Sequence, residues 1–328
     1  MRFKRQQLWP TIKNGNSNTL GWMSENIKND LTIDKNTKII SLGSCFAREI
    51  KFWLLNNGFN YLIGEDKKNP WKSKDIFTGD NGTSPNEHAS IAWERVYNTF
   101  TFRHIIDYTF NDDKMDNRLL EVNLKGKKYV SDIIRTRMLY PSREVAEKDI
   151  KDHIEESKKM FTSADIVIFT LGLTEIWESK ERGIVSSTNP FKHYKLPDDF
   201  EFRVSRFNEN LENLKYSYEI LKKYNKDLKF LVTVSPVHLL ATYRNDLDVI
   251  SASCNSKSTL RAVADEFKDV EGVTYFPSYE IASITAGLDG INAFPDNHHV
   301  SRKVVSHIMN TFNKKFVMQW LRKYVYQL

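Results

Sequence analysis

Two short polar segments of this chain hold the residue types that nucleophilic catalysis needs. Ser44 and Cys45 follow Gly43 and supply a hydroxyl and a thiol side by side. Far along the chain, His299 follows Asp296 by three residues, so a carboxylate in the same turn can accept a hydrogen bond from the imidazole and fix its tautomer. A nucleophile and an oriented base together predict attack on a carbonyl carbon, with the proton moving through the histidine.

The surroundings of the two nucleophiles favour the same chemistry. Gly43 ends an apolar run and a helical pattern begins at Cys45, so both side chains lie at the N-terminus of a predicted helix. Backbone N–H groups there, including that of Phe46, and the positive end of the helix dipole lower a thiol pKa and stabilise an oxyanion. The alternative is structural, with Ser44 as a helix cap and Cys45 as an inert, half-buried thiol. Spacing alone leaves these two interpretations even.

Further polar residues follow two other apolar runs. The Thr174 hydroxyl is a candidate oxyanion donor, and Glu175 either binds a substrate hydroxyl or, as the commoner role, caps the next helix. Ser235 ends the third apolar run, and His238 beyond it is a rival base, although a histidine at a strand end is more often structural. A metal site at residues 296–299 would lack a second ligand cluster with suitable spacing, so no metal is predicted.

Three buried strands are predicted to position these turns: Lys38–Leu42, Asp165–Leu171 and Leu228–Val234. Helices are predicted after the first strand and at about 91–108, 144–162, 204–224, 258–267 and 300–316, with a short strand at 273–276. A hairpin is predicted with arms 120–124 and 127–130, and long loop excursions at 65–90 and 178–200. Apolar strands that alternate with helices predict a parallel sheet covered on both faces, with ligands at the carboxyl ends of its strands.

Composition limits the class of protein. The chain has 328 residues, 40% hydrophobic and 27% charged, which is enough for one large core with insertions. Its net charge of +6 is small against 48 basic and 42 acidic residues, and no basic stripe alternates with aromatics, so nucleic acid is not expected as a partner. The start of the sequence has no secretory pattern and no run is long enough to cross a membrane. With only two cysteines, Cys45 and Cys254, a cytoplasmic location is expected.

The two ends of the chain differ from its middle. Residues 1–37 are polar and rich in turn formers, and they are expected to form a leader that packs on the edge of a domain spanning 38–316. Residues 317–328 are amphipathic and aromatic and predict a C-terminal helix. Such a helix packs on the domain or on a second subunit, or else it contacts a membrane surface near lipid-linked sugars.

Several motifs together resemble the GSCFA family, whose namesake motif stands here as Gly43–Ala47. Four longer matches follow in the family's order, and a His-His-Val match precedes the last helix. These matches are FTLGLTEIW (169–177), TVSPV (233–237), SKSTLRAVA (256–264), YFPSYEI (275–281) and HHV (298–300). The resemblance covers about residues 38 to 316. It implies a divergent branch of the SGNH/GDSL hydrolases, and hence a three-layer α/β/α, flavodoxin-like domain with a parallel central sheet and long loop insertions.

The resemblance also implies roles for particular residues. The SGNH acid–base block Asp-x-x-His matches Asp296 and His299, and Thr174 stands where the superfamily has its oxyanion asparagine. In strict register with Gly-Asp-Ser, Cys45 takes the nucleophile's place and Ser44 the aspartate's, whereas a slip of one residue would make Ser44 the nucleophile. Cys45 is favoured because it begins the helix. The oxyanion glycine that follows the second strand in the superfamily has no clear counterpart here.

The function implied by this resemblance is acyl-ester chemistry on a carbohydrate. The first expectation is a bacterial O-acetyltransferase that modifies a surface or capsular polysaccharide, with no tightly bound cofactor and with acetyl-CoA as a candidate acyl donor. One alternative is an esterase that acts on carbohydrate or small esters with water. The other is a non-catalytic binding or assembly module that keeps the fold. The oligomeric state is not indicated by the sequence.

Overall fold

Four parallel strands form the central sheet, in the order β1-β5-β9-β10. These strands are β1 (Ile39–Gly43), β5 (Ile166–Leu171), β9 (Lys229–Val234) and β10 (Val273–Phe276). Tyr61 adds a parallel bridge to Ile39 on the outer edge of β1. In chain order the sheet therefore runs 2-1-3-4-5, the order of flavodoxin-like folds. The computed structural model describes residues 9–10, 23, 31–64, 89–91, 93, 95–111, 117–124, 126–186 and 197–318.

The side chains of the strands divide the core into two parts, one on each face of the sheet. Along β5, Val167, Phe169 and Leu171 belong to one hydrophobic cluster, whereas Ile166 and Ile168 belong to the other. This division follows from the two-residue period of a strand, and it requires apolar cover on both faces. The continuous apolar runs of the sequence therefore predicted the central strands correctly.

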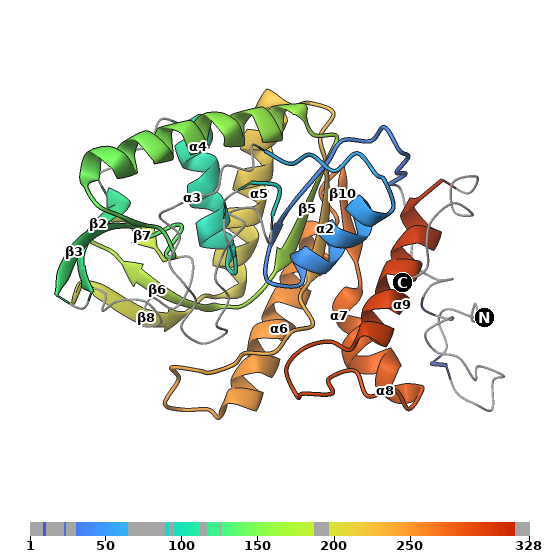
Figure 1. Ribbon diagram of the computed structural model, residues 1–328. Coiled ribbons are helices and arrows are strands. Elements are labelled where there is room, and N and C mark those ends of the chain that lie inside the picture. The colour runs from blue at the N-terminus through green and yellow to red at the C-terminus, as the bar shows by residue number, and fades with distance from the viewer. Residues whose placement is uncertain are drawn as a thin grey trace.

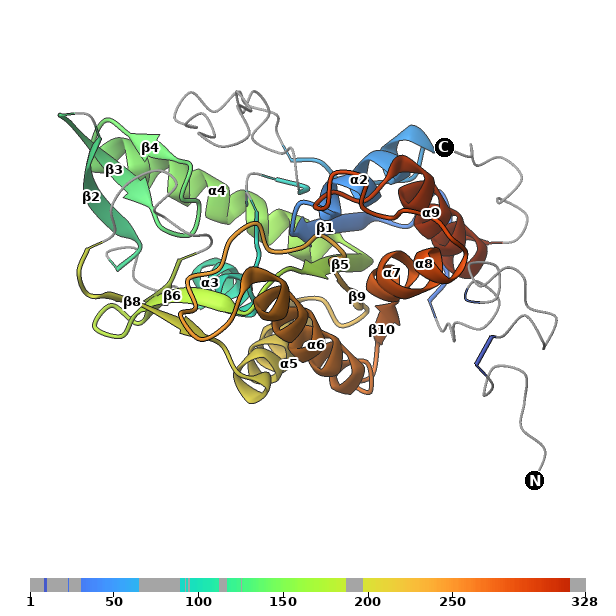
Figure 2. The same ribbon diagram turned by 90° about the horizontal axis from the view of Figure 1, so that it is seen from below.

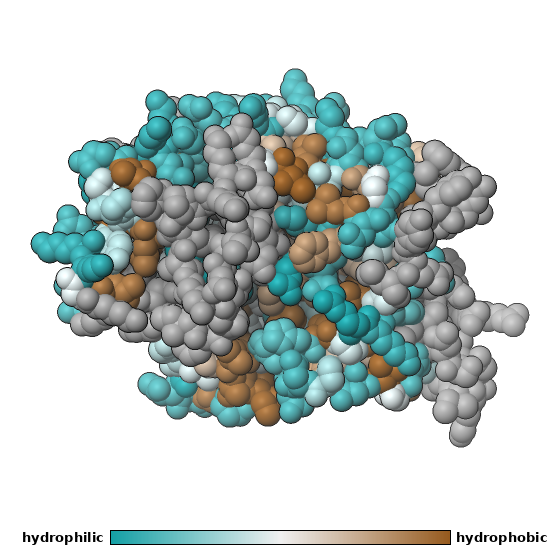
Figure 3. All heavy atoms as spheres, in the orientation of Figure 1, coloured by the Kyte–Doolittle hydropathy of each residue, from teal (hydrophilic) through white to brown (hydrophobic). Residues whose placement is uncertain are grey.

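Helices cover both faces and complete a three-layer α/β/α fold (Figure 1). On one face lie α2 (Ala47–Asn56) and α9 (Arg302–Phe316). The other face carries α3 (Thr99–Phe110), α4 (Arg143–Ser163), α5 (Phe207–Tyr224) and α6 (Val249–Phe267). The predicted fold class is thus confirmed. Hydrophilic residues dominate the top of the space-filling view, where the outer side of the long helix α4 faces solvent (Figure 3).

Two small antiparallel sheets lie on the side of the molecule opposite α9 (Figures 1 and 2). One contains β2 (Leu119–Leu124), β3 (Lys127–Asp132) and β4 (Leu139–Tyr140), so the predicted hairpin is confirmed. The other contains β6 (Glu175–Ser179), β7 (Ile184–Val185) and β8 (Phe200–Val204). This second sheet corrects the predicted excursion at 178–200. Its short strands alternate charged and apolar residues too briefly to give a clear periodic signal.

Two helices begin elsewhere than predicted because of their side-chain caps. The helix predicted from residue 91 begins at Thr99, where the Asn98 side chain accepts from the amide of Thr101 at 2.8 Å. Helix α6 begins at Val249 rather than at 258, because the Asp248 carboxylate accepts from the first amides of the helix. Before that helix, the amides of Ser90 and Val96 donate hydrogen bonds to β1, at Ser41 and Gly43.

The segment after β10 winds into three short helical pieces before it reaches α9. These are α7 (Ser278–Glu280), a π-helical turn at Ile281–Thr285 and α8 (Ala286–Leu288). The loop 289–301 then leads to α9 and contains the Asp296–His299 motif. No helix among the described residues combines the length and apolar character needed to cross a bilayer.

The end of the predicted leader packs where the last helix ends. Leu31 and Ile33 are buried, and Ile33 forms a parallel bridge with Val317. Val317 is thus extended, which corrects the start of the helix predicted at 317–328. Residues 319–328, and most of residues 1–30 and 65–88, lie outside the described residues.

Candidate functional site

The turn after β1 is built on a close approach between two strands. Gly43 has φ of +138°, and a Cβ added there would lie 2.5 Å from the carbonyl oxygen of Thr170 and 2.7 Å from its nitrogen. Only glycine fits such a position. The amide of Ser44 then donates to the Thr170 carbonyl at 3.0 Å, which fixes the turn against β5. In the parallel register, Gly43 pairs with Thr170 and Thr170 pairs with Thr233, so the three strands end level with one another.

This geometry separates the two candidate nucleophiles. The Ser44 side chain is buried, with 2% of the residue exposed, and its hydroxyl has no hydrogen-bond partner. Cys45 is partly exposed and carries a free thiol. A serine nucleophile needs a base within hydrogen-bond reach, and Ser44 has none in this structure. Cys45 is therefore the more exposed of the two residues.

The backbone around Cys45 offers hydrogen-bond donors. Helix α2 begins at Ala47 with Phe46 as N-cap, and no side chain caps it. The amides of Ala47, Arg48 and Glu49 bond back to the carbonyls three residues earlier. In contrast, the amides of Cys45 and Phe46 donate to no backbone carbonyl among the described residues, and the Cys45 amide lies close enough to its own sulfur to lower the pKa of the thiol. These two N–H groups are the candidate oxyanion donors. The Phe46 ring itself is buried in the core.

Three cations act on the thiol. Burial raises the pKa of Cys45, while the charges of Arg95, Lys257 and Arg48 lower it. Among the described residues, the charges named as acting on this thiol are all cations. Burial is the larger effect, so the pKa of Cys45 lies above its ordinary value, and the three cations offset only part of that cost.

Helix α6 binds the turn that follows β5. The hydroxyl of Ser256 accepts from the Thr174 amide at 2.8 Å and from the Thr174 hydroxyl at 3.2 Å. The next residue, Lys257, donates from Nζ to the Gly172 carbonyl at 2.6 Å. Both donors of Thr174 are thus bound to Ser256, so its predicted oxyanion role would require this pair to separate.

Two further candidates hold the loop between β9 and α6. Glu175 begins strand β6, which corrects its predicted role as a helix cap, and its carboxylate accepts from the Thr242 hydroxyl and the Tyr243 amide. Ser235 donates its amide to Leu171 at 2.8 Å, and its hydroxyl accepts from a loop amide. Both residues shape the rim of the site, and their hydrogen bonds are to the protein itself.

The Asp296–His299 turn presents an oriented imidazole. One oxygen of Asp296 accepts from the amides of His298 and His299 at 3.0 and 2.7 Å, and the other contacts His299 Nδ1 at 2.7 Å. Asn297 has φ of 61°, the left-handed conformation that asparagine tolerates. The hydrogen bond from His299 holds the pKa of Asp296 well below its usual range. Because an ionised carboxylate only accepts, Nδ1 carries the proton, and Nε2 of the neutral ring is left as an acceptor.

The turn lies near the thiol's helix without touching the thiol. Arg302, one turn beyond His299, bonds to Glu49 of α2 at 2.8 Å. His299 itself is exposed, with 68% of its side chain accessible, and among the described residues its ring bonds to Asp296 but to neither nucleophile. The rival base His238 is half-buried against the Phe294 ring, with 4.4 Å between ring centroids. Burial and the charge of Lys257 lower the pKa of His238.

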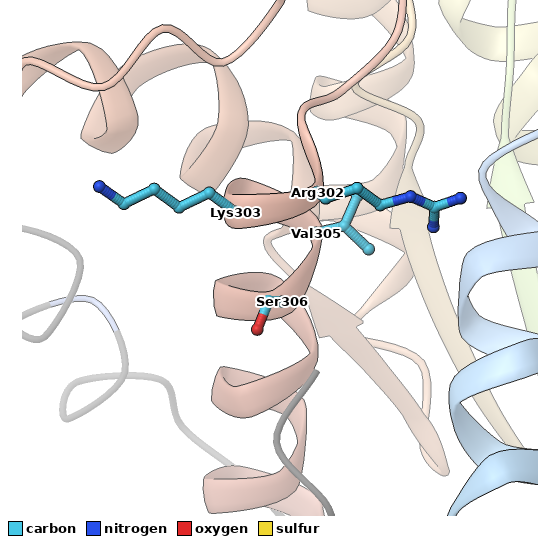
Figure 4. A pocket seen from close by; sticks show the side chains of 4 residues that line it. All are labelled: Arg302, Lys303, Val305 and Ser306. Atoms are coloured by element: carbon cyan, nitrogen blue, oxygen red, sulfur yellow. The ribbon is translucent and has the colours of Figure 1, made fainter.

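A separate hollow lies on the outer side of α9. Its described lining residues are Arg302, Lys303, Val305 and Ser306, and its volume is about 500 Å³ (Figure 4). None of these four is a candidate catalytic residue, so the hollow is not evidence for the chemistry at Cys45. Within the described residues, no three side chains of His, Cys, Asp or Glu gather to hold a metal ion.

Lys257 is the site residue that the sequence interpretation missed. The buried face of α6 contains Ser253, Ser256, Lys257 and Leu260, so the lysine occupies a core position of an amphipathic helix. A helix assumed to begin at 258 excludes Lys257. It also excludes the preceding buried positions, whose helical spacing would have placed the lysine on the inner face. The Asp248 cap would have been the signal to extend the helix.

Comparisons with known proteins give one match. A model of the GSCFA family matches residues 38–312, which include the β1 turn, the β5 turn, Lys257 and the Asp296–His299 motif. No curated protein matches the chain, and no solved structure matches it.

Proposed function

The chain belongs to the GSCFA family, and from this membership and the geometry of the β1 turn we propose that it transfers an acyl group through Cys45. The observation that carries the proposal is the position of the thiol. Cys45 is partly exposed at the N-terminus of α2. Its own amide and that of Phe46 donate to no backbone carbonyl among the described residues, and three cations act on its thiol, whereas the hydroxyl of Ser44 is buried.

The proposed reaction proceeds in two steps. His299 takes the thiol proton on Nε2 while the sulfur of Cys45 attacks the carbonyl of an ester or thioester. The amides of Cys45 and Phe46 bind the oxyanion, and the imidazolium returns its proton to the leaving group, which leaves a thioester on Cys45. A hydroxyl acceptor, deprotonated by the same histidine, then attacks the thioester and restores the thiol. Since His299 does not contact Cys45 in this structure, its approach to the sulfur is part of the proposal.

The proposed acceptor is a carbohydrate hydroxyl and the proposed donor is acetyl-CoA. This assignment follows from the resemblance to SGNH hydrolases, many of which act on carbohydrate esters. The cations around Cys45 support the negative charge that develops on a carbonyl oxygen during attack by the sulfur. An O-acetyltransferase for a surface polysaccharide in the cytoplasm fits both points. An esterase would use the same site with water as acceptor.

Intact mass spectrometry tests the proposal. Wild type, Cys45→Ala, Ser44→Ala and His299→Ala are each mixed with acetyl-CoA or with a simple acetyl ester and weighed. Cys254→Ala is the matched control, because Cys254 is the other free thiol and is exposed on α6. We expect the wild type, Ser44→Ala and Cys254→Ala proteins to gain one acetyl group, Cys45→Ala to gain none, and His299→Ala to gain it about 10²–10⁴ times more slowly.

The pattern of adducts separates the alternatives. An adduct lost with Ser44→Ala but kept with Cys45→Ala would overturn the assignment of the nucleophile. If no protein gained an adduct from either donor, acyl transfer would be refuted and a binding module would be favoured. Discharge by added sugars rather than by water would distinguish a transferase from an esterase.

A further inference from the structure

We propose that Lys257 is a positioning residue whose ammonium group stabilises the thiolate form of Cys45. This inference rests on the proposed function, because it assigns the group that prepares the nucleophile for attack. Lys257 comes from α6, more than 200 residues beyond Cys45 in the sequence, and the fold brings the two together at the carboxyl edge of the sheet.

The position of the lysine is unusual for its residue type. Lys257 is only 3% exposed and lies on the buried face of α6. Its one hydrogen bond among the described residues is to a neutral acceptor, the Gly172 carbonyl, at 2.6 Å. No ion pair with a carboxylate is formed by its ammonium group within the described part of the chain. A buried ammonium costs several kcal/mol unless an anion or strong hydrogen bonds compensate it.

Among the described residues, the charged group that acts on this ammonium group is Cys45. Burial lowers the pKa of Lys257 to about 8, and the charge of Cys45, when the thiol ionises, raises it. In return, Lys257 is among the three cations that lower the pKa of the thiol. The effect is mutual, as it must be for two charges that interact, and it identifies the pair.

The backbone places both residues beside the end of the same strand. Lys257 Nζ donates a hydrogen bond to the carbonyl of Gly172, the residue that directly follows β5. The Ser44 amide donates to the carbonyl of Thr170, in the same strand, at 3.0 Å. The end of β5 therefore lies between the lysine and the thiol's turn. No hydrogen bond joins Nζ of Lys257 to the sulfur of Cys45 among the described contacts, so the lysine acts through its charge rather than by accepting the proton.

Further titratable and charged groups act on Cys45 or interact with Lys257. Arg48 comes from α2 and Arg95 from the segment before α3, and both act on Cys45. His238, from the loop after β9, faces Lys257 and is favoured in its neutral form. Arginine side chains keep their charge in proteins, whereas a lysine can lose it. The charge at Lys257 can therefore be removed either by substitution or by raising the pH, and the two effects can be compared.

A titration of the thiol tests the role of Lys257 without any acyl donor. In a Cys254→Ala background, Cys45 is the only thiol, and its ionisation is followed by thiolate ultraviolet absorbance against a Cys45→Ala, Cys254→Ala blank. Lys257→Gln removes the charge but keeps a donor for Gly172, and Lys257→Arg keeps the charge. Lys51→Met is the matched control, because Lys51 is also buried and bonded to a backbone carbonyl but is not among the charges that act on Cys45.

We expect Lys257→Gln to raise the midpoint of Cys45 ionisation by about one pH unit or more, and Lys257→Arg to leave it within a few tenths of a unit. Lys51→Met should leave the midpoint unchanged. An unchanged midpoint in Lys257→Gln would overturn the inference and leave the lysine a structural role at Gly172. A rise in both Lys257→Gln and Lys257→Arg would also overturn it, since the effect would then follow geometry rather than charge. Because no substrate is involved, these outcomes stand apart from the success or failure of the acetylation experiment.

Discussion

Replacement of Gly43 by alanine should destabilise the protein by more than its backbone conformation alone explains. With φ of +138°, an L-residue at this position carries a conformational cost of about 1–3 kcal/mol. The new Cβ would also lie 2.5–2.9 Å from three backbone atoms of Thr170, which no side-chain rotation can relieve. Overpacking of this kind typically costs a further 1–3 kcal/mol or so. We therefore expect a total loss of about 2–6 kcal/mol.

The chain offers a control that isolates the second cost. Gly126, in the turn between β2 and β3, also has positive φ, at +79°, but a Cβ added there would meet nothing within 4 Å. Gly126→Ala should therefore cost about 1–2 kcal/mol, the conformational part alone. Urea unfolding followed by tryptophan fluorescence gives both free energies, and the midpoint for Gly43→Ala should fall by on the order of 1 M.

The comparison has a clear refuting outcome. If Gly43→Ala and Gly126→Ala unfold at the same urea concentration, Thr170 does not approach the β1 turn as closely as described. The position assigned to Ser44 and Cys45 would then also be wrong, because the Ser44 amide bonds to the carbonyl of that same threonine.

Two further predictions concern buried charge away from the site. Asp132 is fully buried between two arginines, so Asp132→Asn should lower the free energy of unfolding, measured in urea, by about 3–5 kcal/mol. The control Asp246→Asn, which breaks an exposed ion pair, should lower it by less than about 1 kcal/mol. Equal losses in the two variants would contradict the buried network. Burial lowers the pKa of His104 to about 4, and its Nε2 accepts from the Val185 amide. Since the unfolded chain binds that proton below its ordinary pKa of 6.5, stability should fall as pH decreases from about 6.5 toward 4, by up to about 3 kcal/mol from this group. His104→Gln should show a correspondingly shallower fall in unfolding free energy, and an unchanged pH dependence would exclude the assignment.

The sequence predicted the central fold because its signals were local. The runs at 39–43, 166–171 and 229–234 are mostly apolar and, apart from Lys229, buried along their length, which is what a strand covered on both faces requires. Helix starts were less well predicted, since a cap such as Asp248 is a single polar residue with no periodic signal of its own. The sheet of β6, β7 and β8 was missed because its strands are short and pair across a segment of about 20 residues.

The candidate site was predictable in its location but not in its contacts. Strand ends and the Asp296–His299 spacing identify the edge of the sheet and the oriented imidazole. The choice between Ser44 and Cys45 depends on one residue of register, and that register is set by a hydrogen bond to Thr170, about 125 residues away in the sequence. A contact of that range has no signature in the local pattern, so sequence reasoning left the nucleophile open.

Violations of ordinary packing rules give an argument for the site that does not depend on family membership. Gly43 adopts a backbone conformation that other residues avoid. Among the described residues, the buried Ser44 hydroxyl has no hydrogen-bond partner and the buried Lys257 has no carboxylate partner. Each of these features costs free energy, on the order of 1–3 kcal/mol or more. All three surround one partly exposed thiol at the carboxyl edge of a parallel sheet. Several local costs retained at one place, where ligands bind in this architecture, are what the proposed chemistry at Cys45 would require.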